Sequence, residues 1–188
     1  MFRKLRIGIA LIAIAGFVSC EGDYIPKPNG YYRIALEEKN YVTYDSDCPF
    51  SFDFPDISKI ENGGGPCWIN INYPKYNATI HMTYKALYED NAMTVLKEAS
   101  MLAYDHTSKA EGISGTEYSN PNTNVHGMVF DIYGNSASNV QFFVTDSTRN
   151  FLRGALYFNA IPNSDSIAPI KDYIRDDIFR VVESLRWR

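Results

Sequence analysis

Histidine is scarce in this sequence, with three residues in 188. No H-E-x-x-H motif places two of them on one helical face, which excludes the common zinc-peptidase site. The run "GISG" (112–115) lacks one residue of the G-x-S-x-G nucleophile elbow. The run "GGGP" (63–66) has neither the Lys-Ser/Thr of a phosphate loop nor a helix after it. We therefore predict a protein that is not an enzyme and that holds no metal or other cofactor.

Basic tracts are also missing. The chain contains 18 Lys and Arg against 22 Asp and Glu. Residues 1–19 hold three of the basic residues and none of the acidic ones, so the rest of the chain carries a formal charge of −7. An acidic chain of this kind is a poor binder of nucleic acid or anionic lipid through charge. We predict no nucleic-acid partner.

The apolar run that opens the chain, residues 7–18, is too short to cross a bilayer, because a transmembrane helix needs about 20 apolar residues. A basic start (residues 3–6) precedes it, as in secretory signals. Ser19 and Cys20 follow it, an arrangement that resembles the lipobox of bacterial lipoproteins, in which the cysteine is acylated and becomes the new N-terminus. The alternative is a plain secretory signal with an incidental cysteine.

The lipobox predicts three segments. Residues 1–19 form a lipoprotein signal peptide, residues 20–30 a lipidated polar tether with two prolines, and residues 31–188 one folded domain of ordinary size. More than one acyl chain on Cys20 gives stable attachment. We expect the domain to lie in the cell envelope, anchored to a membrane and facing the periplasm.

Two further cysteines remain, Cys48 and Cys67. In an exported protein, two thiols predict a disulfide, which would stabilise the fold by roughly 3 kcal/mol through the chain-entropy effect. Each cysteine adjoins a proline, in "CPF" and "PCW", so each is expected at the edge of a strand. Two unpaired thiols are the alternative, and a zinc site would need further ligands nearby.

Most of the chain shows the period of two that predicts half-buried strands. In "FSFDF" three phenylalanines share one face. Polar turns separate the segments, and such short connections favour antiparallel neighbours. The expected strands cover residues 50–54, 67–72, 77–84, 116–119, 124–133, 138–146 and 150–159.

Two stretches show a helical period instead. Residues 92–109 repeat apolar side chains every three or four positions and include His106, with Gly112 and Gly115 expected to end the element. A long helix follows "NSDS" (163–166), with Pro169 expected in its first turn and the acids Asp172, Asp176, Asp177 and Glu183 on an exposed face. The predicted fold is a single α+β domain, an antiparallel sheet covered by at least two helices.

Polar residues interrupt the apolar strands of the last hairpin, residues 136–159. They are Gln141, Arg149 and Arg153, and Arg153 alternates onto the same face as Tyr157. One interpretation is an arginine at the open end of a sheet, with its stem packed on aromatic rings. The other is a surface that contacts a partner, built from Gln141, Arg149, Arg153 and Tyr157, because Arg and Tyr are favoured at interfaces.

Several uncommon motifs follow one another along the chain: "DSDCPF", "CWINI", "NATIHMTY", "LAYDHT", "SASNVQFFVTDSTRNFLRGALYFN" and the terminal "ESLRW". From about Tyr24 to Trp187 the chain resembles the gliding motility lipoprotein GldD family. The resemblance implies an exported lipoprotein of surface gliding, tied to the type IX secretion machinery, with lipid on Cys20 and a Cys48–Cys67 pair. The layout is also similar to a PsbP-like α-β-α sandwich, which by itself assigns no function.

Two functions follow as hypotheses. The first is a non-enzymatic component or assembly factor of the gliding and type IX secretion apparatus, with protein components of that apparatus as its partners. The alternative is a periplasmic domain that binds a small ligand or cell-wall glycan through Tyr73, Tyr76, Tyr84 and Tyr157.

Overall fold

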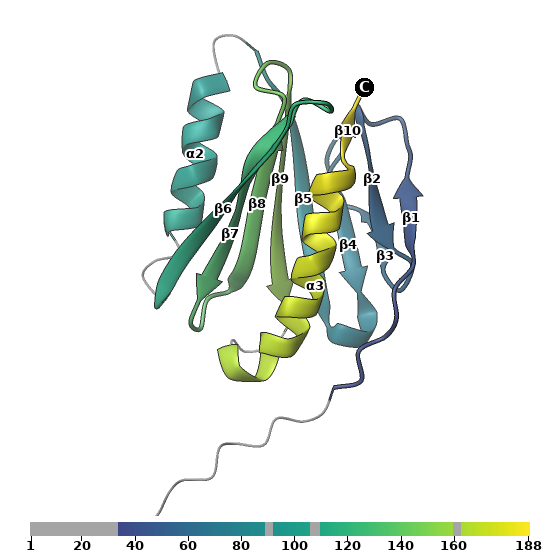
Figure 1. Ribbon diagram of the computed structural model, residues 1–188, viewed down its shortest axis with the longest axis vertical. Coiled ribbons are helices and arrows are strands. Elements are labelled where there is room, and N and C mark those ends of the chain that lie inside the picture. The colour runs from purple at the N-terminus through teal and green to yellow at the C-terminus, as the bar shows by residue number, and fades with distance from the viewer. Residues whose placement is uncertain (1–33, 89–91, 106–109, 160–162) are drawn as a thin grey trace, which may run out of the picture. The chain divides into compact units, whose positions relative to one another are not determined.

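The computed structural model describes residues 34–88, 92–105, 110–159 and 163–188. They form a single α+β domain whose sheets are antiparallel (Figure 1). The strands are β1 (Tyr41–Tyr44), β2 (Phe50–Pro55), β3 (Lys59–Asn62), β4 (Ile69–Tyr73), β5 (Ala78–Ala86), β6 (Gly112–Asn120), β7 (Val125–Tyr133), β8 (Ser138–Thr145), β9 (Asn150–Phe158) and β10 (Arg186–Trp187). The helices are η1, a 3₁₀ turn (Pro74–Tyr76), α2 (Ala92–Asp105) and α3 (Ser164–Ser184).

The main sheet has seven strands in the order β3-β4-β5-β9-β8-β7-β6. Adjacent residues of one strand point to opposite faces, so each strand serves two layers. In β8, Phe142 packs in the cluster that contains Ile178 of α3, whereas Phe143 packs with Val95 of α2. The sheet therefore lies between the two helices, and the predicted fold class is confirmed.

A small sheet lies beside α3, with β2 between β1 and β10. The alternation predicted for "FSFDF" is present, because Phe50 and Phe52 are 0% and 1% exposed. Both rings join the core cluster of the main sheet and α3. The chain ends here, where the Trp187 ring meets Phe50 edge to face at 6.4 Å between centroids.

The long helix differs from the prediction in one detail. Asn163 caps α3, since its side chain accepts a hydrogen bond from the Ser166 amide at 3.2 Å. The helix therefore begins at Ser164, and Pro169 lies in its second turn rather than its first. Gly112 and Gly115, expected to end the middle helix, instead belong to β6. His106 lies outside the described residues.

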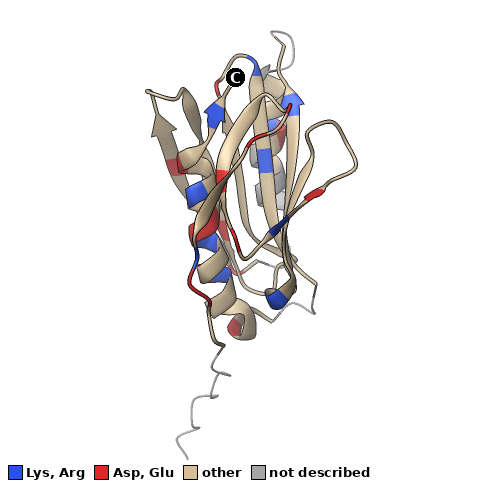
Figure 2. Cartoon of the chain, turned by 90° about the vertical axis from the view of Figure 1, so that its right-hand side faces the viewer, with Lys and Arg blue, Asp and Glu red and all other residues tan. Residues whose placement is uncertain are grey.

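The exposed charged face predicted for α3 is present at Asp172, Asp176 and Glu183, but the prediction is wrong for Asp177. Figure 2 shows both signs of charge along this helix. Asp177 is fully buried, Arg175 pairs with Asp131 of β7 at 2.7 Å, and Arg180 pairs with Asp53 of β2 at 2.6 Å. These contacts join α3 to both sheets, which a helical periodicity cannot reveal.

Candidate interaction surface

Arg153 lies near the middle of β9, directly opposite Thr83 of β5. The pairing register places it on the α2 side of the sheet, on the same face as Phe151, which packs with α2. We call the part of this sheet surface around Arg153 the "Arg153 face". It consists of Asn70, Thr79, His81, Thr83, Lys85, Arg153, Ala155 and Tyr157.

Gln141 of β8 holds the Arg153 side chain in position through a hydrogen bond. Its side chain is 1% exposed, and its Oε1 accepts a hydrogen bond from Arg153 Nη2 at 3.0 Å. Gln141 Nε2 is buried and has no hydrogen-bond partner among the described residues. The structure thus brings together Gln141 and Arg153 of the predicted set, with Gln141 positioning the guanidinium rather than facing solvent.

A cavity of about 300 Å³ opens beside Arg153. The small side chain of Ala155 in β9 leaves room for it, and the remaining lining comes from His81, Thr83, Arg153, Gly154 and Tyr157. The His81 ring is oriented by a 2.8 Å hydrogen bond between its Nδ1 and Asn70 Oδ1. It also meets the Tyr157 ring edge to face at 5.6 Å. The polar groups that line the cavity are a guanidinium, an imidazole and the hydroxyls of Thr83 and Tyr157.

Four neighbouring strands, β4, β5, β8 and β9, contain no Asp or Glu. Arg153, His81 and Lys85 therefore lie on strands without acidic residues in a chain that is acidic as a whole, and the glutamates that the sheet carries on this face, Glu61 and Glu117, lie on its edge strands β3 and β6. His81 and Thr83 were not singled out as site residues from sequence, although this acid-free stretch was visible there as a signal.

Arg149, the remaining arginine of the predicted set, lies elsewhere. It belongs to the turn between β8 and β9 and lines a separate cavity of about 750 Å³, together with Tyr84 and Arg188. Asp146 organises this turn, because its Oδ1 accepts the backbone amides of Thr148, Arg149 and Asn150 at 2.8–2.9 Å. The structure separates Arg149 from the Arg153 face.

The pH dependence of stability in an Asp146→Asn variant tests whether the Asp146 carboxylate stabilises this turn. Burial alone would raise the pKa of Asp146, but the amide bonds from Asn150, Arg149 and Thr148 outweigh it and lower the pKa below its usual 3.8. A lowered folded-state pKa stabilises the fold above pH 3.8, and this contribution is lost as the pH falls through the folded value. We expect the variant to lose about 1–3 kcal/mol at pH 7 in urea unfolding, because the amide cannot replace both acceptor oxygens.

The loss in the Asp146→Asn variant should shrink as the pH is lowered below 3.8, where the wild-type carboxyl takes up its proton. Asp172→Asn is the control, since this exposed acid on α3 has only a surface ion pair with Lys171. A difference that stays constant from pH 7 down to acid unfolding would contradict the role assigned to the Asp146 charge.

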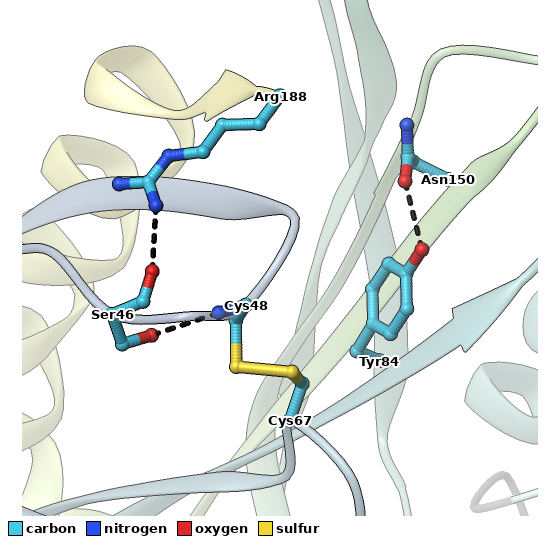
Figure 3. The surroundings of a disulfide bond; sticks show 6 residues. All are labelled: Ser46, Cys48, Cys67, Tyr84, Asn150 and Arg188. Carbon is cyan, nitrogen blue, oxygen red and sulfur yellow. Dashed lines mark hydrogen bonds between the residues drawn. A yellow bond between two sulfur atoms is a disulfide. The ribbon is translucent and has the colours of Figure 1, made fainter.

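A disulfide joins Cys48 and Cys67, which lie just before β2 and β4 (Figure 3). Their Cα atoms are 5.6 Å apart. Ser46 connects this bond to the C-terminus: its Oγ accepts from the Cys48 amide, and its carbonyl accepts from Arg188 Nη1 at 2.6 Å. The bond therefore ties the loop before β2 to the β3–β4 hairpin.

The four tyrosines proposed as a glycan platform do not form one surface. Tyr73 is 1% exposed and donates to Asp177, and Tyr76 is 6% exposed with its ring against Tyr173. Tyr84 donates to Asn150 Oδ1 at 2.8 Å near the β8–β9 turn. Tyr157 alone of the four belongs to the Arg153 face.

A strap formed by residues 34–41 contacts α3 and carries the most buried ionic contact described. Lys39 Nζ lies 2.8 Å from Asp177 Oδ1, and Tyr41 donates to the same oxygen at 2.7 Å. Tyr73 donates to the other oxygen at 3.0 Å. Burial raises the pKa of Asp177 above 3.8 despite these bonds, and burial together with the Asp177 charge raises the pKa of Tyr73 well above 10.

Within the described residues, no group of three or more His, Cys, Asp or Glu side chains could hold a metal ion. None of the helices among them is both long enough and apolar enough to span a membrane. Cys20 and the rest of the predicted tether lie outside the described residues.

Comparison with known proteins gives one family match. A family model described as "Gliding motility lipoprotein GldD" matches residues 21–187. None of the curated proteins compared with the chain matches it. Among solved structures, the solution structure of cyanobacterial PsbP (CyanoP) from Synechocystis sp. PCC 6803 is similar over 81% of this chain and 95% of its own, with 10% sequence identity and a TM-score of 0.47.

Proposed function

Because the chain belongs to the gliding motility lipoprotein GldD family, which implies a part in gliding motility, we propose that it acts as a non-enzymatic assembly factor of the gliding and type IX secretion machinery. Lipid on Cys20 holds the domain at a membrane, on the periplasmic side. The domain then engages protein components of the apparatus through the Arg153 face.

The observation that carries this proposal is the family match over nearly the whole chain after the predicted signal peptide. The Arg153 face supports it as a contact surface, since a half-buried arginine and two rings surround an open cavity of about 300 Å³. Arg and Tyr are enriched among residues that dominate binding energy at interfaces. Arg153 and Tyr157 belong to this surface, Gln141 lies buried beneath Arg153, and Arg149 lies elsewhere.

Membrane attachment through Cys20 is the first part to test. We expect wild-type protein to sediment with membranes and to lack residues 1–19, and Cys20→Ala to keep them and to migrate as the longer chain, since the cysteine is the residue that is acylated and becomes the new N-terminus. The measurement is fractionation followed by immunoblotting. Ser19→Ala is the matched control, because it changes the neighbouring residue and leaves the thiol in place. Wild type and Cys20→Ala of equal size on the immunoblot would contradict lipid anchoring.

The assembly role is tested by purification from membranes. Wild-type protein and Cys20→Ala are each captured through an affinity tag, and the proteins that copurify are identified by mass spectrometry. Motility and secretion components recovered with wild type and diminished with Cys20→Ala would support an anchored assembly factor. Recovery of none of them with wild type would overturn the proposal.

A further inference from the structure

The Arg153 guanidinium is half-buried but has no carboxylate partner among the described residues. Its hydrogen bond is to a neutral amide oxygen, that of Gln141. Buried and half-buried charges are normally paired, because removal from water costs free energy that an opposite charge recovers. Arg175 shows the usual arrangement in this same domain, with two hydrogen bonds of 2.7 and 2.8 Å to Asp131.

The side chain of Arg153 is held in place before any partner arrives. One donor is fixed on Gln141, which is 1% exposed, and the side chain lines the cavity of about 300 Å³. An arginine has five N–H donors in a planar fork that matches a carboxylate. A preoriented guanidinium loses less conformational entropy on binding than a free surface lysine.

The surroundings favour an anionic group at this position. No acidic residue occurs in β4, β5, β8 or β9, so no carboxylate of these strands competes for Arg153. Thr83, His81 and Tyr157 add polar groups around the cavity. The cavity has the size of a few side-chain groups, which suits the carboxylate of an Asp or Glu side chain.

The distribution of charge over the domain favours a peptide rather than a lipid bilayer as the partner of Arg153. An extended anionic membrane surface would act on the whole domain, whose chain carries a net charge of −7 after residue 19. A short protein segment can contact only the four strands that lack acidic residues. Acidic groups of the domain that lie more than about 8–10 Å from that segment are largely screened at physiological salt.

We propose that the Arg153 face docks an acidic segment of a protein partner, with one carboxylate of that segment in the cavity on Arg153. This inference rests on the proposed assembly function and narrows it to the chemistry of the partner. Gln141 is a positioning residue in this arrangement, because it acts through Arg153.

The test uses full-length lipoprotein in detergent micelles and a fluorescein-labelled hexaglutamate peptide, with labelled hexaglutamine as the uncharged comparison. Binding is followed by fluorescence polarisation. We expect binding of hexaglutamate that weakens as salt is raised, and a loss of about tenfold in affinity for Arg153→Gln, in line with a charge-assisted hydrogen bond. The matched control is Arg149→Gln, which removes the same charge from the same hairpin but off the Arg153 face. Its affinity should change less than twofold.

The docking proposal would be overturned by equal affinity of wild type and Arg153→Gln, by equal losses in the two arginine variants, or by equal binding of hexaglutamine. Full competition by phosphatidylglycerol vesicles would assign the face to lipid instead and would also overturn it. Circular dichroism of each variant shows whether it is folded. Gln141→Glu provides a second variant, because a carboxylate beside Arg153 should occupy the guanidinium and weaken hexaglutamate binding about as much.

The membrane purification separates this inference from the assembly role. If Arg153→Gln retains the motility and secretion components that Cys20→Ala loses, the docking proposal fails and the assembly function stands. If wild type recovers none of these components, the assembly function fails even where hexaglutamate binds at Arg153.

Discussion

Asp177→Ala is expected to lower the free energy of unfolding by about 3 kcal/mol or more. The Asp177 carboxylate is fully buried and accepts hydrogen bonds from Lys39, Tyr41 and Tyr73. Its removal leaves two tyrosine hydroxyls without their acceptor and an ammonium group, on a side chain that is 10% exposed, without its counter-charge. Loss of one partner of a buried ionic contact is costly for this reason, whereas loss of an exposed one is not.

The control for this variant is Asp176→Ala, which removes the same charge from the adjacent, exposed position of α3. We expect it to change the unfolding free energy by less than about 0.5 kcal/mol. Guanidinium unfolding at pH 7 measures both. Limited proteolysis gives a second measure, because the strap at residues 34–41 should be cleaved faster in Asp177→Ala. Equal stability of the two variants would show that the network does not hold the strap.

The pH dependence of this network has a defined sign. Burial raises the pKa of Asp177 above 3.8, so the folded state binds its proton more tightly than the unfolded state does. The stability linked to this titration is complete below pH 3.8 and is lost as the pH rises through the folded pKa. Acid lability of the domain is therefore expected from Asp146, whose pKa is lowered, and not from Asp177.

Removal of the disulfide is the second large effect. Cys48→Ala with Cys67→Ala should lower the unfolding free energy by about 3 kcal/mol, since the bond closes a loop with a sequence separation of 19 and restricts the unfolded chain. Urea unfolding of the double variant measures the loss. Wild-type protein unfolded with and without reductant is the internal comparison and should show a difference of similar size.

The backbone at position 67 does not add to this loss, because alanine bears the same conformational cost there as cysteine. Cys67 has a φ of 55°, in the left-handed region that costs a non-glycine residue about 1 kcal/mol or more. The loop before it packs under Trp68, where a Cβ on Gly65 would approach the indole to 2.5 Å. A double variant as stable as the oxidised wild type would show that these loop contacts alone hold the β3–β4 hairpin.

Local pattern was enough for much of the fold. The alternation in "FSFDF" predicted β2, and the helical period after "NSDS" predicted α3, because both signals depend on neighbours within a few positions. The strands β1, β3 and β10 were not predicted, since they have two to four residues and no distinct alternation. Pro169 was assigned to the first turn because a proline near a capping residue usually marks it.

For the candidate site, sequence predicted Arg153 and Tyr157 on one face, because residues four apart in a strand share a side. It also grouped Arg149 with them from proximity along the chain, whereas the turn at Asp146 directs that arginine to another cavity. Asp177 was interpreted as a solvated helix residue. Its partner Lys39 is 138 positions away, and no local pattern encodes such a pair.

The sequence by itself therefore determined the longer strands and the two helices, the antiparallel arrangement, the cysteines available for pairing and the family, all of which depend on short-range periodicity or on motifs in order. Tertiary structure alone decided which charges are buried and which are free. The free energy of a charge depends on the groups that surround it in space. That dependence gives Asp177 three partners on the strap and β4, and it leaves Arg153 beside an open cavity with an amide as its one described hydrogen-bond partner.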